Sequence, residues 1–258
     1  MVMYMDKKDL SGRLLKWIAI IAMVLDHAAY VFVPNGTVLY FVMRFIGRIT
    51  GPTMFFFLVE GYHHTKNIKK YILRLFVFAL IAYIPFIYCF FGSLPNQSNF
   101  FRLNIMYTLG IGLLAVHIKN VVQPKWLAIC LILGLGIMSF VGDWSIIGFI
   151  IIMIFESNYG NKKMQMRNYL ILAIVYIGIE IIVSMSMQAN AIDNSFVSTM
   201  LNNISLGMVV PVFLLKNYNG NRGKVGNIEK WAFYWIYPLH LMILIFIRYI
   251  ILYINVSR

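Results

Sequence analysis

The chain has 258 residues, of which 61% are hydrophobic and only 12% are charged. Soluble domains carry about 25% charged residues, so this composition excludes a soluble protein. The net charge of +13 does not indicate nucleic-acid binding, because Lys and Arg gather in the cytoplasmic loops of membrane proteins. We therefore expect an integral membrane protein that has no nucleic-acid partner.

Repeated apolar runs are long enough for helices that cross a bilayer, which takes about 20 residues, and too long for the strands of a barrel. We predict an all-α polytopic membrane protein with about nine transmembrane helices. Residues 1–13 are a cytoplasmic lead-in, and 14–258 form a single membrane domain. The predicted spans are 14–33, 38–61, 68–91, 103–118, 126–141, 144–156, 169–187, 199–216 and 231–254.

The distribution of positive charge predicts the orientation of these spans. If the N-terminus is inside, 17 of the 22 Lys and Arg residues lie in the lead-in or in inside loops. The outside segments hold only Arg102 and Arg258. This asymmetry favours an inside N-terminus and an outside C-terminus.

The cysteines and histidines do not predict a metal site or a disulfide. No Cys/His cluster has the spacing of a zinc site. Cys89 and Cys130 both lie inside apolar runs, where isolated thiols more often pack than pair. The chain also shows no internal repeat of the kind found in transporters.

Ionisable residues lie well inside the first two spans: Asp26, His27, Arg44 and Arg48. A charge at the centre of a span costs about 2.5–3.5 kcal/mol on insertion scales, so such residues usually face one another or a polar cavity. Neighbours on a helix point about 100° apart, so Asp26 is expected to meet an arginine while His27 faces elsewhere. The arginines either form a structural network with Asp26 and Glu180, or hold an anionic ligand.

Two histidines within spans have alternative interpretations. His27 is either a neutral base in a cavity or a side chain bonded to a neighbouring backbone group. His240 lies in the middle of the last span, just after Tyr237 and Pro238. The proline predicts a bend that frees a carbonyl group, so His240 is either a second functional imidazole or a satisfied residue of the kink.

Smaller features predict packing or polar contacts. Gly47 and Gly51 with Pro52 predict close helix packing and a kink in the second span. In the outer half of the fourth span, Asn104, Tyr107 and Thr108 could line a polar pocket open to the outside.

Two further features lie at the cytoplasmic side. Glu60, near the cytoplasmic end of the second span, either meets basic residues of the next loop or contributes to the substrate pocket. The cytoplasmic loop Tyr218–Gly226 combines glycines with Arg222 and Lys224, which suits a phosphate. It lacks the spacing of a P-loop, so an ordinary basic loop is the alternative.

Several motifs, taken together, resemble the TraX family, which is named for the F-pilin acetylase. They cover the chain from about Leu15 to Ile245 and read LKWIAIIAMVLDH, RFIGRITGPTMFFFLVEGYHHTKNIKKYILRL, LNIMYTLGIGLLA, GDWSIIG, YNGNRGK and YWIYPLHLMIL. The family is similar in turn to integral membrane acyltransferases that modify cell-surface sugars.

The resemblance implies transfer of an acetyl group from cytosolic acetyl-CoA, without a metal, in a multi-pass protein of the bacterial plasma membrane. The implied acceptor is an amine or hydroxyl of a membrane-associated or exported partner, such as a peptide N-terminus or a glycan. His27 would be the general base, and the catalytic group would comprise His27, Asp26, Arg44, Arg48 and His240. The donor would contact Arg222, Lys224, Asn219, Tyr237 and Arg74.

Two other classes of function are consistent with the same residues. Buried Asp, Glu, His and Arg also suit a proton-coupled carrier or flippase for a lipid-linked or peptide substrate. An accessory scaffold of a secretion system is a third interpretation, but it gives no reason to bury two arginines beside a histidine.

Overall fold

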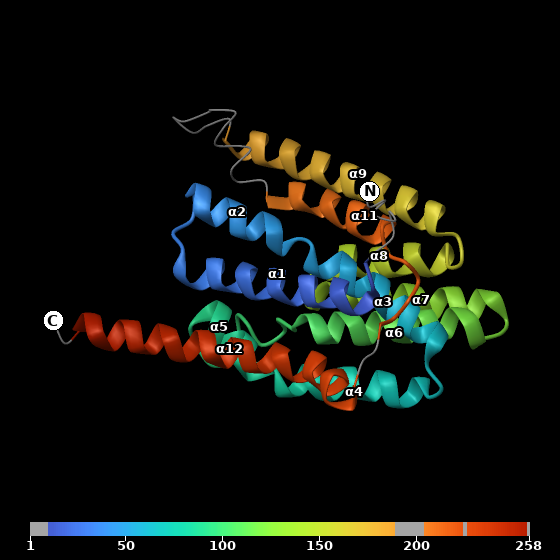
Figure 1. Cartoon of the computed structure of the whole chain (residues 1–258), viewed down its shortest axis with the longest axis horizontal. Coiled ribbons are helices and arrows are strands. Elements are labelled where there is room, and N and C mark those ends of the chain that lie inside the picture. The colour runs from blue at the N-terminus through green and yellow to red at the C-terminus, as the bar shows by residue number, and fades with distance from the viewer. Residues whose placement is uncertain (1–9, 189–203, 224–225, 257–258) are drawn as a thin grey trace, which may run out of the picture. The chain divides into compact units, whose positions relative to one another are not determined.

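The computed structural model describes residues 10–188, 204–223 and 226–256 (Figure 1), and the regular elements within them are all helices. They are α1 (Gly12–Phe32), α2 (Val38–Gly47), α3 (Thr50–His64), α4 (Ile68–Ile81), α5 (Tyr83–Phe91), α6 (Ile105–Val121), α7 (Lys125–Met138), the 3-10 helix η1 (Ser139–Val141), α8 (Ser145–Ser157), α9 (Lys162–Gln188), the 3-10 helix η2 (Ile204–Val209), α11 (Val210–Lys216) and α12 (Asn227–Val256). The predicted all-α class is confirmed. Lys224, Arg258, most of the lead-in and the start of the eighth predicted span lie outside the described residues.

Several helices are long and apolar enough to cross a membrane. Among the described residues, four qualify alone: Gly12–Phe32, Val38–His64, Lys162–Ser186 and Ile228–Asn255. A fifth qualifies if α4 and α5, which meet at a bend of 45°, count as one span. Shorter apolar helices occupy Ile105–Val121, Lys125–Val141, Ser145–Ser157 and Ser205–Lys216. The count of nine spans and their orientation stay predictions.

Side-chain caps fix where several helices begin. The side chains of Ser11, Thr37, Asn67 and Asn104 accept backbone N–H bonds in the first turns of α1, α2, α4 and α6. These residue types are the preferred N-caps, because their oxygens satisfy donors that have no partner within the helix.

The second predicted span is divided, as its proline indicates. We expected one kinked helix over 38–61, whereas α2 ends at Gly47 and α3 begins at Thr50. Pro52 has no N–H to donate to the carbonyl of Arg48, so the helical ladder is interrupted there. The third span breaks at Ala82 for the same reason, because Pro85 cannot donate to Ile81.

The seventh span begins earlier than predicted. We expected a loop up to Asn168, whereas α9 starts at Lys162. The side chain of Asn161 accepts a hydrogen bond from the backbone N–H of Met164 at 3.1 Å. This cap starts the helix within a polar stretch that hydropathy alone assigns to a loop.

The described helices belong to two compact units, each built from two stretches of chain. Unit 1 comprises Met1–Met54 and Asn158–Gly226, and unit 2 comprises Phe55–Ser157 and Asn227–Arg258. In unit 1, α1 packs beside α2, and α9 packs beside α11 (Figure 1). The single membrane domain predicted over 14–258 stays a prediction.

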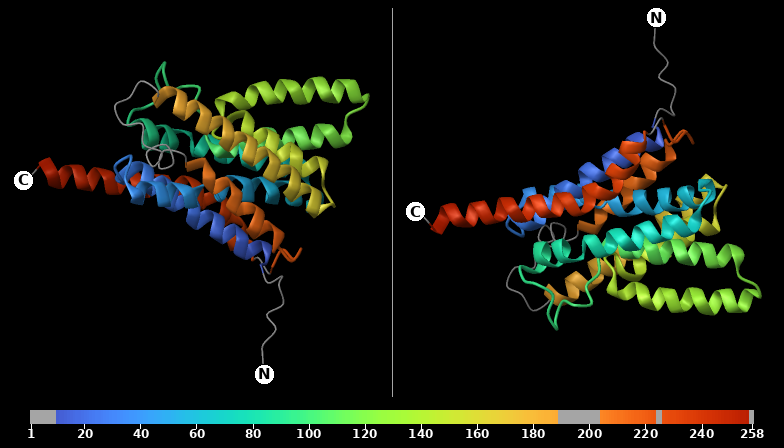
Figure 2. Two further views of the ribbon diagram at one scale, coloured as in Figure 1. Left: turned by 90° about the horizontal axis from the view of Figure 1, so that it is seen from above. Right: turned by 90° about the horizontal axis from the view of Figure 1, so that it is seen from below.

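In unit 2, α6 packs against α4, α7 and α8, while α12 runs along α5 and α4 (Figure 2). A core of Ile111, Ala115, Leu135 and Phe149 joins α6, α7 and α8. Both cysteines are free thiols, as predicted, with Cys89 buried.

Candidate functional site

His27 lies on the buried face of α1 in unit 1. Leu15, Ala19, Met23 and His27 recur every four residues, and all four are buried. His27 is 8% exposed. Because residues four apart share one face of a helix, the imidazole belongs to the packed stripe of α1.

Asp26 points from α1 toward α2 and meets Arg44, which confirms the predicted pairing of Asp26 with an arginine. Arg44 Nη1 donates to Asp26 Oδ2 at 2.6 Å, and the two side chains are 13% and 15% exposed. The Arg44 guanidinium also lies 5.6 Å and 5.8 Å from the ring centroids of Tyr30 and Tyr40. Arg44 is therefore held by one carboxylate and two aromatic rings.

Gly47 allows α2 to approach this ion pair. A Cβ atom at Gly47 would lie 2.2 Å from Asp26 Oδ1 and 2.3 Å from Asp26 Cβ. Only a glycine fits at this distance, so the predicted close packing at Gly47 is confirmed. Thr50, at the start of α3, adds a hydrogen bond to α1, because its hydroxyl donates to the carbonyl of Ala19 at 2.9 Å.

Arg48 and Glu180 form a second polar group in unit 1. Since α2 ends at Gly47, Arg48 lies in the break rather than one turn beyond Arg44 on a regular helix. Its charge acts on both Asp26 and Tyr176. The Ser205 hydroxyl donates a hydrogen bond to Glu180, and the Tyr176 side chain lies close to the same carboxylate.

Asp26, Arg44, Arg48 and Glu180 thus all lie in unit 1. Gly207 of η2 packs against this break, because a Cβ there would lie 2.1 Å from the Phe45 carbonyl oxygen. Tyr176 and Ser205 were not singled out from the sequence. Tyr176 was detectable, since it precedes Glu180 by four residues on the same helical face.

The glycine-containing loop is attached to the start of α1. Tyr218 forms a bridge with Leu10, and the backbone N–H of Asn219 donates to the Leu10 carbonyl at 3.1 Å. The Asn219 side chain accepts from the N–H of Asn221 at 2.9 Å, so it shapes the loop. Arg222 is exposed.

His240 and Tyr237 lie in unit 2, on α12, which continues through Pro238 as one helix. His240 is 6% exposed, and its Nδ1 lies 2.8 Å from the Ile236 carbonyl oxygen. A carbonyl can only accept, so Nδ1 carries a proton. The assignment of His240 to the catalytic group stays a prediction. Tyr237 is buried, and its ring centroid lies 5.5 Å from that of His240.

Three residues predicted to line an outer pocket bond to backbone groups of unit 2. Asn104 Nδ2 donates to the Ala79 carbonyl at 2.8 Å, Tyr107 to Met138 at 3.1 Å, and Thr108 to Asp143 at 2.5 Å. These bonds tie α6 to α4, to α7 and to the turn before α8. The assignment of the three residues to a substrate pocket stays a prediction.

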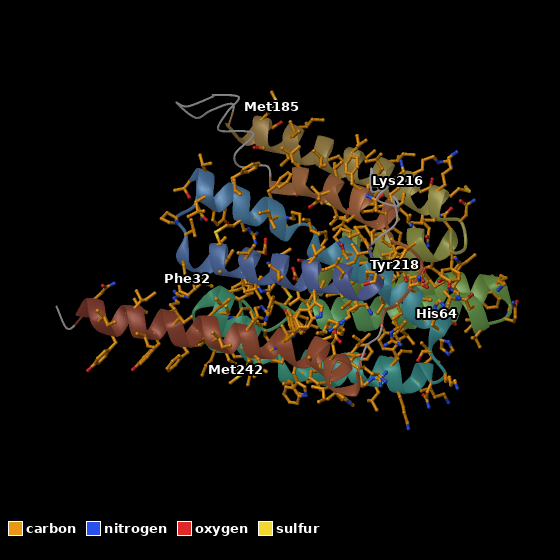
Figure 3. The ribbon with its side chains drawn as sticks, in the orientation of Figure 1. Phe32, His64, Met185, Lys216, Tyr218 and Met242 are labelled. Atoms are coloured by element: carbon orange, nitrogen blue, oxygen red, sulfur yellow. The ribbon has the colours of Figure 1, made fainter. Side chains whose placement is uncertain are left out.

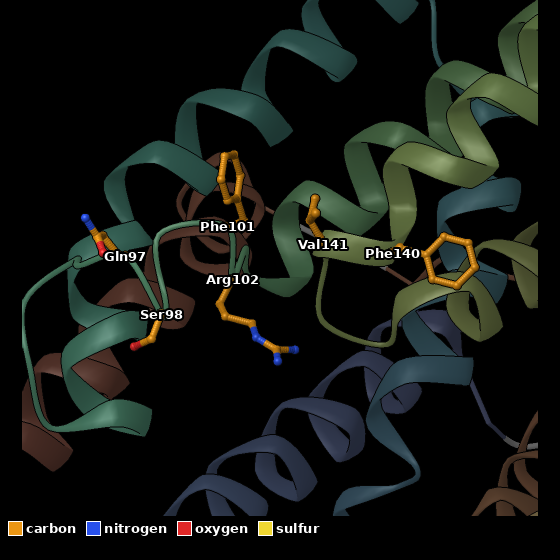
Figure 4. A pocket seen from close by; sticks show the side chains of 6 residues that line it. All are labelled: Gln97, Ser98, Phe101, Arg102, Phe140 and Val141. Atoms are coloured by element: carbon orange, nitrogen blue, oxygen red, sulfur yellow. The ribbon is translucent and has the colours of Figure 1, made fainter.

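Other predicted residues of unit 2 have separate surroundings. Arg74 lies 5.8 Å and 5.7 Å from the ring centroids of Tyr71 and Tyr234. The backbone carbonyl of Glu60 accepts from His64 at 2.8 Å. A cavity of about 180 Å³ opens elsewhere (Figure 4), and none of the predicted pocket residues lines it. Its lining consists of Gln97, Ser98, Phe101, Arg102, Phe140 and Val141.

Comparison with known proteins identifies the family. The model of the family described as TraX protein matches residues 11–248. The chain belongs to the TraX family. This match confirms the resemblance in the motifs and includes parts of both units, from the residue before α1 to Arg248 in α12.

A relative of this TraX chain is described as "Probable fimbrial assembly protein FimC, serogroup H1", from Dichelobacter nodosus. The two are 34% identical over 241 residues, which cover 92% of this chain and 95% of the relative. No solved structure matches the chain. The TraX family and the apolar helices together indicate a membrane protein.

One cluster of this TraX protein was not predicted from the sequence. Glu156, whose side chain is 3% exposed, lies 2.9 Å from His63 Nε2. Asn120 donates to its other oxygen at 2.7 Å. Nearby, Lys119 donates to Ser157 at 3.0 Å. Burial lowers the pKa of Lys119, and the charge of Glu156 acts in the opposite direction.

Replacing Glu156 by alanine is expected to destabilise unit 2 by about 2–4 kcal/mol, because it removes a buried acceptor from two donors. Thermal unfolding of the purified protein in detergent measures the change. His63→Ala should also lower the midpoint, whereas His64→Ala should not, since His64 is exposed and bonds to its own helix. Equal unfolding midpoints for the two histidine variants would show that the contact between His63 and Glu156 does not stabilise the protein.

Proposed function

We propose that this TraX protein is an integral membrane acetyltransferase. It moves an acetyl group from cytosolic acetyl-CoA to an amine or hydroxyl of a membrane-associated or exported acceptor. The observation that carries the proposal is the buried imidazole of His27 beside the Asp26–Arg44 ion pair, within a helix long enough to cross a membrane. Ionisable residues in such positions usually mark a functional site.

The comparisons support the choice of acceptor. The motifs resemble a family named for a pilin acetylase, and a relative is described as a fimbrial assembly protein. Both point to an exported peptide, with a cell-surface glycan as the other acceptor class. In this proposal the protein crosses the bacterial plasma membrane nine times, with its N-terminus inside and its C-terminus outside.

The chemistry is a general-base acyl transfer. His27 accepts a proton from the acceptor N–H or O–H as the acceptor attacks the thioester carbonyl. The carbon–sulfur bond then breaks, the acetyl group stays on the acceptor, and the CoA thiolate takes up the proton. Arg48 stabilises the oxyanion, while Arg44 holds Asp26 and α1 in place.

Other predicted residues keep supporting roles in this proposal. Asn219, Arg222, Lys224, Arg74 and Tyr237 stay the predicted contacts of the donor, and His240 stays a predicted member of the catalytic group. Asn104, Tyr107, Thr108 and Glu60 contribute to the acceptor pocket.

Incubation of the wild-type protein in detergent with acetyl-labelled CoA tests the function. Peptides with a free or a blocked N-terminus serve as acceptors. The expected result is release of free CoA together with label on the acceptor. A protein that neither binds nor consumes acetyl-CoA, yet moves a peptide or lipid-linked substrate across proteoliposomes, would instead be the carrier.

A further inference from the structure

Positive charge gathers at one end of unit 1, which we name the basic end. It comprises the start of α1, the start of α9 and the segment after α11, and its cations are Arg13, Lys16, Lys162, Lys163, Lys216 and Arg222. Lys216 is the last residue of α11, and Tyr218 follows it in the chain (Figure 3).

The described part of unit 1 offers no acidic residue near this end. Its only described carboxylates are Asp26 and Glu180, which follow the starts of α1 and α9 by 14 and 18 residues. A helix rises about 1.5 Å per residue, so they lie about 21 Å and about 27 Å along their helices. The described carboxylates of unit 1 therefore lie far along their helices from the basic end.

Specific contacts hold the basic end in a defined shape. Lys162 Nζ donates to the Tyr218 carbonyl at 2.5 Å and lies 5.6 Å from the centroid of the Tyr218 ring. The Gly12 N–H donates to the Asn221 carbonyl at 2.8 Å. Lys162 therefore fastens the loop, which lies across the first turn of α1.

A glycine brings the loop directly onto Arg13. Gly223 has φ +79°, and a Cβ there would lie 3.0 Å from Arg13 Cβ and 3.4 Å from Ser11 Oγ. Arg13 and Arg222 are both exposed, and the surrounding contacts order the loop that lies beside Arg13. Guanidinium groups form paired hydrogen bonds with phosphate oxygens.

We propose that the basic end binds a terminal phosphate monoester, with Arg13 and Arg222 as its principal partners. The inference rests on the proposed function for the source of that phosphate, which is the ribose 3′-phosphate of the acyl donor. Arg13 and Lys162 were not among the donor-binding residues predicted from the sequence. A phospholipid headgroup could supply similar chemistry, so the test separates the two sources.

Binding of three probes to the full-length protein in a neutral detergent tests the proposal: CoA, CoA without its 3′-phosphate, and pantetheine. Wild type is expected to bind CoA about 10-fold more tightly than dephospho-CoA, since each charge-assisted pair is worth more than a neutral bond. Arg13→Gln and Arg222→Gln should each remove most of that preference and leave the affinity for dephospho-CoA unchanged. Arg167→Gln is the matched control, because Arg167 is an exposed cation of α9 that bonds to Asn168.

Equal affinity of wild type for CoA and dephospho-CoA would overturn the proposal. Nanodiscs of phosphatidylcholine, with or without phosphatidylglycerol, identify a lipid source. If the anionic lipid abolishes the preference for CoA in wild type, a headgroup occupies the site and the nucleotide assignment is wrong. Because binding is measured without turnover, a phosphate preference without acetyl transfer would contradict only the proposed function. Transfer without any phosphate preference would contradict only this inference.

Discussion

Replacing His27 by alanine is expected to lower acetyl transfer about 10²–10⁴-fold, which is the usual contribution of a positioned general base. Acetyl-CoA binding should change little, because the donor's phosphates are expected to bind at the basic end, far along α1 from His27. Turnover and donor affinity are measured on the same purified sample, so a loss of kcat is separated from a loss of binding.

Controls separate chemistry from folding at this position. His27 is 8% exposed, so alanine also leaves a cavity that lowers stability. His27→Gln keeps most of the volume and removes the titrating ring, and it should be as inactive as the alanine variant. A glutamine variant with wild-type turnover would remove His27 from the reaction and leave it as a packing residue of α1.

Replacing Asp26 by alanine is expected to destabilise unit 1 by about 3–5 kcal/mol, because it leaves the Arg44 guanidinium buried without its carboxylate. Arg44 is 13% exposed, and its guanidinium otherwise contacts the rings of Tyr30 and Tyr40 within the described residues. Unfolding in detergent, followed by heat or denaturant, measures the loss.

A double variant distinguishes a structural pair from a functional one. Asp26→Leu with Arg44→Met removes both charges together, and such replacements are often neutral or stabilising. We expect this protein to fold nearly as well as wild type but to lose turnover, because His27 follows Asp26 directly and depends on the position of α1. If Asp26→Ala costs less than about 1 kcal/mol, the pair is as weak as a surface ion pair.

Much of unit 1 could be predicted from the sequence, because a charged side chain within a membrane needs an opposite charge or a polar cavity beside it. Asp26 had few cationic partners within spans, so its contact with an arginine followed from the cost of leaving either charge alone. The small side chain at Gly47 predicted close packing, and Pro52 predicted the kink that appears as a break between α2 and α3.

Other features depend on tertiary contacts that sequence patterns do not encode. Glu156 and His63 are 93 positions apart, and neither belongs to a spacing that predicts the other. Asn104, Tyr107 and Thr108 were predicted as pocket residues from their polarity, yet each bonds to a backbone carbonyl. A polar side chain in an apolar helix can either line a pocket or bond to a backbone carbonyl of a neighbouring helix. Only the position of that neighbouring helix distinguishes the two roles.

The unequal lengths of the apolar helices have a consequence for the surrounding lipid. Ile228–Asn255 has 28 residues and Lys162–Ser186 has 25, whereas α6 has 17. At about 1.5 Å per residue these helices measure about 42, 38 and 26 Å, against a hydrocarbon thickness of about 30 Å. A spanning helix longer than the hydrocarbon layer tilts or extends beyond it, and α6, if it spans as predicted, is expected to thin the bilayer around it. The acyl-chain length of the surrounding lipid is therefore expected to affect the tilt of these helices. Reconstitution of the protein in a bilayer of a single thickness favours one set of tilt angles.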